Sequence, residues 1–419
     1  MLCFCFEVKS MEPKKIFLFN PTCELAVLNA SESYNPPEIL RKMERDLSVL
    51  PLFMCAPQDV VLASEKPSEN FLQLLRPLVK KFPSFFTTEE CAVICAETGG
   101  EVLLKPWGWS PLAHRQLREL KSFCSEKEKD SSFFNWKASH RDLFARSSSL
   151  KVLADVICNA GVGFIGKEQM PRVCESTQEA LDVLSEIEGT KVMKSPWSSS
   201  GRGLQVVKTK ELNRAKSEWL RTTLREQGYV MVEPWLQKRA DFTFQFEIDC
   251  DGTPVFLGTT RFDTNAFGQY QSSVAGDFRD GLSEELCGFF SDEKIEETVG
   301  LLVRALRQSD YCREFRGNLG IDVMVVEENG ELLVHPCVEI NCRMSMGLLT
   351  LYLNRLVAEG STGRWSFFRA EKGRNFSQFC DENRRKPTVI DGKIVDGFLP
   401  LVPCTDEKLF GAYLEVYKK

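Results

Sequence analysis

The sequence predicts a small N-terminal α/β domain followed by two α+β lobes, and three observations carry this prediction. A short apolar run at residues 15–20 ends in Asn20-Pro21, as a buried strand entering a loop does. Helical and extended patterns alternate regularly between residues 142 and 340, and Asn329-Gly330 is the strongest short signal for a β-hairpin. A length of 419 residues with 43% hydrophobic content allows two to three cores.

The elements follow from their patterns, in chain order. In the N-terminal part, apolar runs predict strands and helical periodicity predicts helices, giving a mostly parallel sheet with strands at 15–20, 47–54 and 91–95 and helices at 38–46 and 70–81. A polar stretch at 122–132 marks a boundary. The first lobe is expected to contain helices at 142–159, 177–187 and 210–227 and strands at 161–165, 191–194, 204–208 and 229–235.

The second lobe and the C-terminus complete the prediction. The second lobe should contain strands at 242–248, 255–260, 318–326 and 332–340 and a helix at 292–308, and the last 35 residues predict a strand pair. Four parts are therefore expected: an N-terminal α/β domain at 11–115, lobe 1 at 116–236, lobe 2 with a metal site at 237–360, and a C-terminal extension packing on the lobes at 361–419.

Composition excludes several classes of function. The chain has 53 Lys plus Arg against 59 Asp plus Glu, a formal net charge of −6, and no long basic run, which argues against a nucleic-acid surface. No window approaches the roughly 20 apolar residues that a membrane span needs. With only three histidines, catalysis by histidine is poorly supported.

The 16 cysteines form no CxxC pair, and many lie in apolar runs, so buried free thiols and a cytoplasmic location are expected. Residues 1–10 lack a basic region and a long apolar stretch, and are therefore a poor secretory signal. Because Met11 precedes the first strand pattern, we interpret these ten residues as an upstream start and base no prediction on them.

The hairpin around Asn329-Gly330 carries the most chemistry. A two-residue turn pairs Glu328 with Glu331, and counting back places Asp322 opposite Cys337, with Glu339 one diagonal step away. Side chains alternate between faces with period two, so Asp322, Glu339 and Asn341 share one face. Three oxygen-bearing side chains suit Mg²⁺, whose remaining ligands are waters and substrate phosphates.

Two other interpretations of this hairpin remain open. Acidic residues on the solvent face of an antiparallel pair are ordinary. His335 and Cys337 share the predicted face with Glu339, so a zinc site is a competing hypothesis, although no fourth ligand has suitable spacing.

Two segments in lobe 1 are suited to a nucleotide. Lys194 ends an apolar strand and precedes a Ser/Gly-rich loop and a returning strand, which can place an ammonium and backbone N–H groups around phosphates; a plain loop is the alternative. The strand at 229–235 ends in Glu233-Pro234, where exposed backbone groups and a carboxylate can bind an adenine and a ribose. The string His140–Leu143 matches a protein-kinase catalytic loop, but Ser147 replaces the required asparagine.

In order and spacing, these segments resemble the ATP-grasp superfamily, over roughly residues 140–355. The resemblance implies a two-lobed grasp that holds ATP, preceded by a small α/β domain. It assigns phosphate binding to Lys194, the flexible loop to Ser200, Gly201, Arg202 and Gly203, the adenine and ribose hinge to Glu233, Trp235 and Leu236, and the metal ligands to Asp322, Glu339 and Asn341.

The resemblance also implies residues for catalysis. Arg343 matches an arginine that often follows the metal-binding asparagine and stabilises the charge of the transferring phosphoryl or acyl phosphate. The early phosphate-binding lysine of the family is assigned to Lys151. Arg261 begins a segment, 261–270, that combines charge with aromatic rings; we expect it to line the acceptor side, with a surface loop as the alternative. The two tryptophans of residues 105–109 are expected to seal a domain interface rather than stack on a ligand.

The resemblance implies an ATP- and Mg²⁺-dependent ligase, in which a substrate carboxylate becomes an acyl phosphate and an amine then attacks it. Its expected partners are small-molecule carboxylate and amine substrates, without nucleic acid or membrane, and a homodimer is compatible with this class. A small-molecule kinase on the same fold and a nucleotide-binding regulator without turnover are the alternatives.

Overall fold

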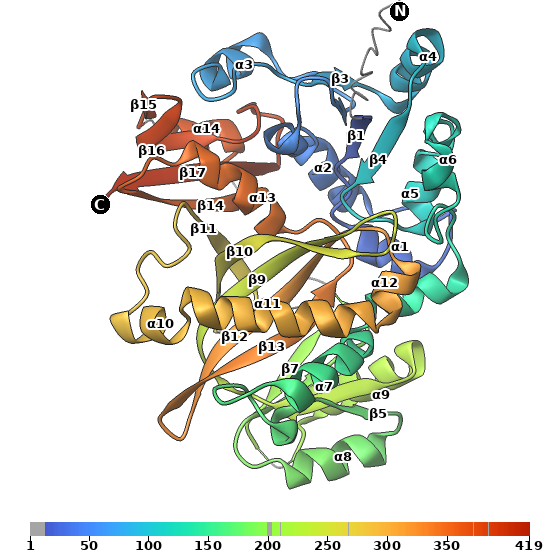
Figure 1. The fold of residues 1–419 in the computed structure, drawn as a ribbon, viewed down its shortest axis with the longest axis vertical. Coiled ribbons are helices and arrows are strands. Elements are labelled where there is room, and N and C mark those ends of the chain that lie inside the picture. The colour runs from blue at the N-terminus through green and yellow to red at the C-terminus, as the bar shows by residue number, and fades with distance from the viewer. Residues whose placement is uncertain (1–12, 199–202, 210, 267, 372, 384) are drawn as a thin grey trace, which may run out of the picture.

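The structure is a computed structural model that describes residues 13–198, 203–209, 211–266, 268–371, 373–383 and 385–419 (Figure 1). Residues 1–10 therefore lie outside the described residues. Three sheets organise the chain: a four-stranded parallel sheet, a second four-stranded sheet, and a sheet of nine strands. Within the described ranges, no helix is long and apolar enough to cross a membrane.

The N-terminal part is an α/β domain whose parallel sheet has the order β3-β2-β1-β4. Its strands are β1 (Lys14–Leu18), β2 (Val60–Leu62), β3 (Ser84–Phe86) and β4 (Val102–Pro106). Its helices are α1 (Cys23–Asn29), α2 (Glu38–Leu47), η1 (Leu50–Met54), α3 (Glu69–Leu75), α4 (Thr88–Thr98), α5 (Pro111–Gln116), η2 (Leu120–Phe123) and α6 (Glu126–Lys129). The parallel sheet and the helix at α2 confirm the prediction.

Two predicted strands in this domain are wrong. Residues 47–54 form the end of α2 and the 3₁₀ helix η1, and residues 91–95 lie inside α4. In α4, the hydroxyl of Thr87 accepts from the N–H of Glu90 while the Glu90 carboxylate accepts from the N–H of Thr87, a capping box that starts a helix. Two of the true strands, β2 and β3, have three residues each, too short for a periodic pattern.

Lobe 1 is a four-stranded sheet with the order β5-β8-β6-β7, covered by helices. Its strands are β5 (Arg172–Cys174), β6 (Lys191–Lys194), β7 (Leu204–Val207) and β8 (Val230–Pro234). Its helices are η3 (Ala138–Phe144), η4 (Arg146–Ser149), α7 (Leu150–Asn159), η5 (Lys167–Gln169), α8 (Thr177–Glu186) and α9 (Arg214–Gln227). The predicted strand at 161–165 is reduced to one bridge between Phe164 and Val334, which joins lobe 1 to the large sheet.

The nine-stranded sheet has the order β13-β12-β9-β10-β11-β14-β17-β16-β15 and is antiparallel throughout. Its strands are β9 (Gln237–Ile248), β10 (Pro254–Thr264), β11 (Tyr270–Ala275), β12 (Gly317–Glu328), β13 (Glu331–Asn341), β14 (Ser361–Arg369), β15 (Thr388–Ile390), β16 (Lys393–Pro400) and β17 (Phe410–Lys418). The helices associated with it are α10 (Glu284–Phe289), α11 (Asp292–Arg307), α12 (Asp310–Glu314), α13 (Met346–Leu353), η6 (Asn354–Leu356) and α14 (Phe376–Glu382). Figure 1 shows α11 lying across this sheet.

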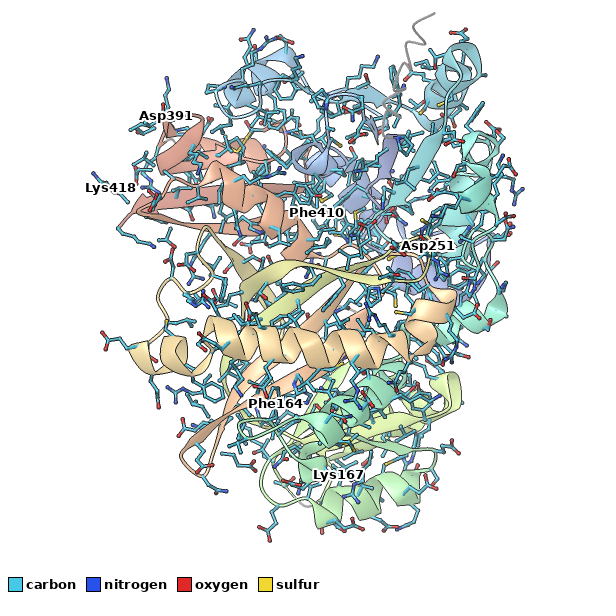
Figure 2. The ribbon with its side chains drawn as sticks, in the orientation of Figure 1. Phe164, Lys167, Asp251, Asp391, Phe410 and Lys418 are labelled. Carbon is cyan, nitrogen blue, oxygen red and sulfur yellow. A yellow bond between two sulfur atoms is a disulfide. The ribbon has the colours of Figure 1, made fainter. Side chains whose placement is uncertain are left out.

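The C-terminal strands continue the sheet of lobe 2 and also close the N-terminal domain. One core cluster combines residues of α2 and η1 with residues of α13, β14, β16 and β17. Phe410, labelled in Figure 2, lies at this junction, where its N–H donates to the buried Asp46 carboxylate at 3.1 Å. The four sequence-based parts thus share sheets and cores, and their boundaries stay a prediction.

The cysteines follow the expectation with one exception. Most of those described are free, and many are buried, among them Cys91, Cys95 and Cys174. Cys380 of α14 and Cys404, after β16, form a disulfide. No local pattern marks this pair, because the two residues are brought together only by the packing of α14 on the C-terminal strands.

Candidate functional site

A cleft of about 980 Å³ lies between lobe 1, the large sheet and the N-terminal domain. Lobe 1 contributes the ends of β6 and β8, the large sheet contributes the β12–β13 hairpin, and the N-terminal domain contributes α1 and α2. The predicted site residues that line it are Lys194, Glu233, Trp235, Leu236, Asp322, Glu339, Asn341 and Arg343. Three segments that are far apart in sequence therefore converge on one cavity.

The hairpin has the predicted turn but not the predicted register. Asn329 and Gly330 both have positive φ angles, of 52° and 83°, and Glu328 pairs with Glu331 as expected. A β-bulge then shifts the register, so that Asp322 pairs directly with Glu339 instead of Cys337. Pro336 lies in the irregular stretch of β13, where its missing N–H cannot contribute to the ladder.

The bulge brings the three predicted metal ligands closer than the sequence suggested. The amide of Asn341 donates to Asp322 at 3.3 Å, and Asp322 lies beside Glu339. Burial and then the charge of Glu339 raise the pKa of Asp322 to about 7, although Arg343 lowers it. Two carboxylates thus lie side by side, and burial is the main reason that the charged form of Asp322 is disfavoured.

This donor set fits Mg²⁺. In the part of the chain that the structure describes, no three His, Cys, Asp or Glu side chains gather in a way that could hold a metal alone. Mg²⁺ seldom needs such a cage, because one or two carboxylates, waters and substrate phosphates usually suffice. Asp322, Glu339 and the Asn341 amide oxygen are hard donors of this kind.

The zinc alternative is not supported. Cys337 is 1% exposed, packs in the hydrophobic core of lobe 2 and does not line the cleft. His335 does line the cleft, and burial, followed by the charge of Lys194, lowers its pKa to about 3. A neutral imidazole beside Lys194 therefore faces the hinge end of the cleft.

The lobe 1 residues form an ion pair in the cleft. Lys194 and Glu233 come from neighbouring strands β6 and β8, and the ammonium contacts the carboxylate, with both side chains largely buried. Gly203 is held against the strand end, where its carbonyl accepts from the N–H of Ser195 at 2.9 Å. The predicted loop residues Ser200, Gly201 and Arg202 lie outside the described residues.

The expectation for Lys151 needs correction. Lys151 lies on α7 with 84% of its side chain exposed, and its ammonium is 4.0 Å from Asp310, outside the cleft. Arg146, in the preceding turn η4, occupies the cleft instead. Its guanidinium donates to Glu339 at 2.7 Å and to Ser198 at 3.1 Å, and its buried Nε has no partner among the described residues.

Arg261 also lies elsewhere than expected. It is 5% exposed and does not line the cleft; its guanidinium donates to the carbonyl of Asp280. The rest of its segment does reach the cleft, through Phe262, Thr264 and Tyr270. Alternate residues of a strand face opposite sides, so the prediction had the right strand but the wrong face.

Arg343 connects the metal-ligand face to the N-terminal domain. Its Nε donates to Glu24 of α1 at 2.8 Å, and its Nη2 donates to Asn341 at 3.3 Å. Burial lowers the pKa of Arg343, and Glu24 and Cys23 more than compensate, so it stays above its ordinary value. Arg343 is therefore a fully charged cation beside the two carboxylates.

The loops after β1 and β4 hold this connection in place. The side chain of Asn20 donates to the carbonyl of Gly108 at 2.7 Å, and the N–H of Met344 donates to the carbonyl of Trp107 at 2.7 Å. Trp107 is 1% exposed and packs edge-on against Phe19, with 4.9 Å between ring centroids. The tryptophan segment thus forms a domain interface, as predicted, at the edge of the cleft.

The sequence prediction missed Arg146, Glu24 and Asp241. Asp241 is 9% exposed, lines the cleft and accepts from Lys238 at 2.5 Å. Glu24 follows the carboxyl end of β1, where parallel sheets commonly bind ligands, and that position was an available signal. No local pattern marks Arg146, because its role depends on contacts across two lobes.

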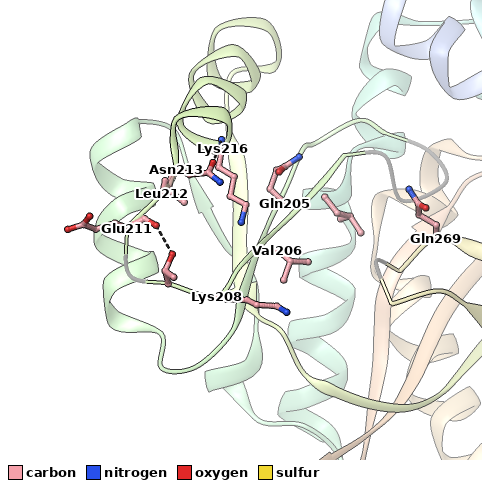
Figure 3. Close-up of a pocket in the computed structure, with 10 residues that line it drawn as sticks. Gln205, Val206, Lys208, Glu211, Leu212, Asn213, Lys216 and Gln269 are labelled. Carbon is pink, nitrogen blue, oxygen red and sulfur yellow. Dashed lines mark hydrogen bonds between the residues drawn. The ribbon is translucent and has the colours of Figure 1, made fainter.

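A second hollow, of about 1010 Å³, lies along β7 of lobe 1 (Figure 3). It is lined by β7 and the start of α9, with Gln269 of the loop between β10 and β11 opposite, and it carries Lys208 and Lys216. Leu204 lines both hollows. Because the predicted strand-end residues converge in the first cleft, that cleft is the candidate site.

Comparisons with known proteins give a curated relative and a set of similar solved structures. No model of a known protein family matches the chain. The chain is 25% identical over 324 residues to a [butirosin acyl-carrier protein]–L-glutamate ligase of Niallia circulans, a match that covers 74% of this chain and 66% of that relative, just under two thirds of its length.

Among solved structures, the chain is similar to a biotin carboxylase of Campylobacter jejuni, with a TM-score of 0.49, 12% identity, and 97% and 88% of the two chains covered. It is also similar to an N5-carboxyaminoimidazole synthetase of Staphylococcus aureus in complex with ADP, with a TM-score of 0.46, 12% identity, and 96% and 92% covered. In this chain, two lobes enclose one cleft, and the segments that resemble the ATP-grasp superfamily in sequence have their strand ends in that cleft.

Proposed function

We propose that this chain is an ATP- and Mg²⁺-dependent ligase that joins a carboxylate to an amine. One observation carries the proposal: the cations Lys194, Arg146 and Arg343 and the carboxylates Asp322 and Glu339 line the same cleft. Phosphoryl transfer relies chiefly on positioning and charge neutralisation, and these groups supply both without a nucleophilic side chain. The ligase name of the relative from Niallia circulans supports the same class of reaction.

The proposed reaction has two steps. A carboxylate oxygen of the substrate attacks the γ-phosphorus of ATP, and ADP leaves with the electrons of the broken P–O bond. The amine nitrogen then attacks the acyl carbon, phosphate leaves, and the nitrogen loses a proton to give the amide. Mg²⁺, held by Asp322, Glu339 and Asn341, would neutralise phosphate charge.

Each group of residues has a role in this scheme. Lys194 and Arg146 bind the phosphates from lobe 1, and Glu233, Trp235 and Leu236 bind the adenosine at the end of β8. Arg343 stabilises the negative charge that develops on the transferring group. Gly203, just before β7, contacts the phosphates from the same side. A cytoplasmic location, and the division into domains at 11–115, 116–236, 237–360 and 361–419, belong to this proposal too.

Glu339→Gln tests the metal assignment. The variant keeps the volume of the side chain but removes one of two charges, so we expect a folded protein with at least about 100-fold lower Mg²⁺-dependent ADP formation. Glu331→Gln, on the same strand but exposed at the turn, is the matched control. Turnover like that of the wild type in Glu339→Gln would contradict the assignment.

The same assay separates the ligase from its alternatives. Phosphate release that requires both a carboxylate and an amine indicates the ligase, whereas ADP formation without phosphate release indicates a kinase. A nucleotide-binding regulator would show a thermal shift with ATP and Mg²⁺ but no ADP with any acceptor. Binding at about 100 times the dissociation constant should stabilise the fold by about 2.7 kcal/mol.

A further inference from the structure

Two buried polar atoms beside the N-terminal domain have no protein partner. One oxygen of the Glu24 carboxylate, Oε1, accepts a hydrogen bond from Arg343. Its other oxygen, Oε2, is buried and has no hydrogen-bond partner among the described residues. The indole Nε1 of Trp107 is likewise buried and unpartnered there. Both side chains line the cleft. Leaving such atoms unsatisfied is costly, so their presence together indicates a ligand with both a donor and an acceptor.

The surroundings of these atoms are mostly apolar, with Arg369 as the charged exception. We name this end of the cleft the acceptor pocket, and its other lining side chains are Leu25, Leu40, Met43, Met346, Phe367 and Phe410. They come from α1 and α2 on one side and from α13, β14 and β17 on the other. Arg369, exposed at the edge of this end, can pair with one carboxylate; any further charged group would lose its hydration here without gaining a partner, whereas an apolar group would be favourably buried.

The position of the acceptor pocket fits a reaction partner. Glu24 bonds to Arg343, which bonds to Asn341, which bonds to Asp322. A group held at Glu24 therefore lies next to the place where a phosphoryl or acyl phosphate would stand. The acceptor pocket also differs in chemistry from the hinge end of the cleft, which contains the ion pair of Glu233 and Lys194.

We propose that the acceptor pocket binds the amine substrate of the ligase, and that this substrate is a primary amine with an apolar or aromatic group, of which apolar α-amino acids are the simplest. Glu24 Oε2 accepts from the amine nitrogen, and Trp107 Nε1 donates to an oxygen of the substrate. The inference rests on the proposed function for the identity of the reaction, but the binding itself does not require turnover.

Calorimetry on the full chain tests this proposal, with Mg²⁺ and a non-hydrolysable ATP analogue present. The probes are L-phenylalanine, L-leucine, L-glutamate, and 3-phenylpropionate, which lacks the amine. We expect saturable binding of L-phenylalanine or L-leucine, and affinities at least about tenfold weaker for L-glutamate and 3-phenylpropionate. No saturable binding of either apolar amino acid, or equal affinity for L-glutamate, would overturn the proposal.

Variants assign the binding to the pocket. Glu24→Gln should weaken L-phenylalanine binding at least about tenfold, because a neutral amide replaces the carboxylate that pairs with the amine. Glu32→Gln is the matched control, since Glu32 belongs to the same domain but is exposed and paired with Arg118. Met43→Ala should weaken L-phenylalanine binding severalfold through lost apolar contact. Unchanged affinity in Glu24→Gln would refute the assignment.

The two proposals fail in different ways. If the ATP analogue with Mg²⁺ does not bind the wild type, the ligase proposal fails, and titrating L-phenylalanine without nucleotide still decides whether the acceptor pocket binds an amine. If the nucleotide binds and no apolar amine does, the ligase proposal stands and the acceptor pocket is wrongly assigned.

Discussion

Arg146 joins two lobes through one guanidinium. The two terminal nitrogens of the guanidinium donate to Glu339 of β13 and to Ser198 of the loop after β6. The backbone N–H of Arg146 donates to the carbonyl of Pro196. A planar, fixed fork of donors suits phosphate oxygens as well as a carboxylate. When a nucleotide binds, we expect Arg146 to lose part of its contact with Glu339 and to contact the phosphates instead.

Arg146→Met and Lys151→Met form a matched pair of variants. We expect Arg146→Met to weaken Mg²⁺-ATP binding by about 10- to 100-fold, as loss of a charge-assisted contact does. Lys151→Met should leave binding unchanged, because that side chain is exposed outside the cleft. Titration calorimetry with the ATP analogue measures both. Weaker ATP binding in Lys151→Met than in Arg146→Met would instead support Lys151 as the phosphate-binding residue.

The strand-end residues that the sequence singles out lie together in the cleft, whereas Lys151 and Arg261 lie elsewhere. Lys194, Glu233 and Asp322 follow or interrupt apolar strands, and such positions are visible in a pattern. Arg146 and Glu24 are recognisable only by what they contact across domains. Arg261 was misplaced because a period of two fixes which residues share a face, but not which face meets the cleft.

At the scale of elements, two loops of the N-terminal domain are joined by hydrogen bonds. They follow the neighbouring parallel strands β1 and β4, and the bonds connect Asn20 with Gly108. A Cβ atom at Gly108 would lie 2.2 Å from Cys23 Sγ and 3.1 Å from the Cβ of Arg343. The backbone there must be glycine for α1 to reach Arg343.

Gly108→Ala should therefore destabilise both the fold and the site. The added methyl group must push α1 away, at a cost of about 1–3 kcal/mol, and should reduce ADP formation by separating Glu24 from Arg343. Gly300→Ala in α11 is the control; no atom lies within 4 Å of its added Cβ, so we expect stabilisation of about 0.5–1 kcal/mol. Denaturant unfolding and the ADP assay measure the two effects. A Gly108→Ala variant with unchanged unfolding free energy and ADP formation would contradict the close packing of Gly108 against Cys23 and Arg343.

Elements with clear periodicity were predicted, and short or irregular ones were not. The strand β6 and the helices α2, α8 and α11 lie close to their predicted ranges, because each combines a regular pattern with a clear end. The error at 91–95 was avoidable, since Thr87 and Glu90 form a capping-box pattern. The bulge in the hairpin was not, because Pro336 signals an irregularity without fixing which residues then pair.

At the scale of the whole molecule, all three histidines are buried. His114 stacks on Trp109, with 4.5 Å between ring centroids, His140 stacks on Phe133 at 4.4 Å, and His335 lies in the cleft. Burial lowers the pKa of all three, to about 3 for His114 and His335. The folded chain therefore holds its histidines neutral, while the unfolded chain protonates them below about pH 6.5.

This difference predicts a loss of stability in acid. The contributions of neutral His114 and His335 are fully present above pH 6.5 and are lost as the pH falls from 6.5 towards 3, because only the unfolded state gains the proton. Asp322, whose pKa is raised to about 7, acts in the opposite direction, so a difference between variants isolates one histidine. From pH 6.5 to 5.5, the unfolding free energy of His114→Gln should fall by about 1 kcal/mol less than that of the wild type. Parallel slopes in denaturant unfolding would show that His114 titrates normally.

The pairing of distant strands is what the sequence could not reveal. The last strands were predicted as a pair of their own, yet β17 lies between β14 and β16 in the sheet that begins with the β12–β13 hairpin. Local patterns report that a segment is extended, but its neighbour is chosen by long-range packing. The same limit applies to the core that α2 shares with the C-terminal strands.

That shared core has a consequence for how the cleft is assembled. Asp46 accepts from the N–H groups of Leu409 and Phe410 at 2.9 and 3.1 Å, so α2 is joined to residues that lie 363 and 364 positions further along the chain. The proposed phosphate and metal ligands all precede Met344, whereas Phe367 and Phe410 supply a wall of the same cleft. The cleft therefore gains this wall only when β14 and β17 pack beside α2, and detachment of these strands would open the cleft without removing any of those ligands.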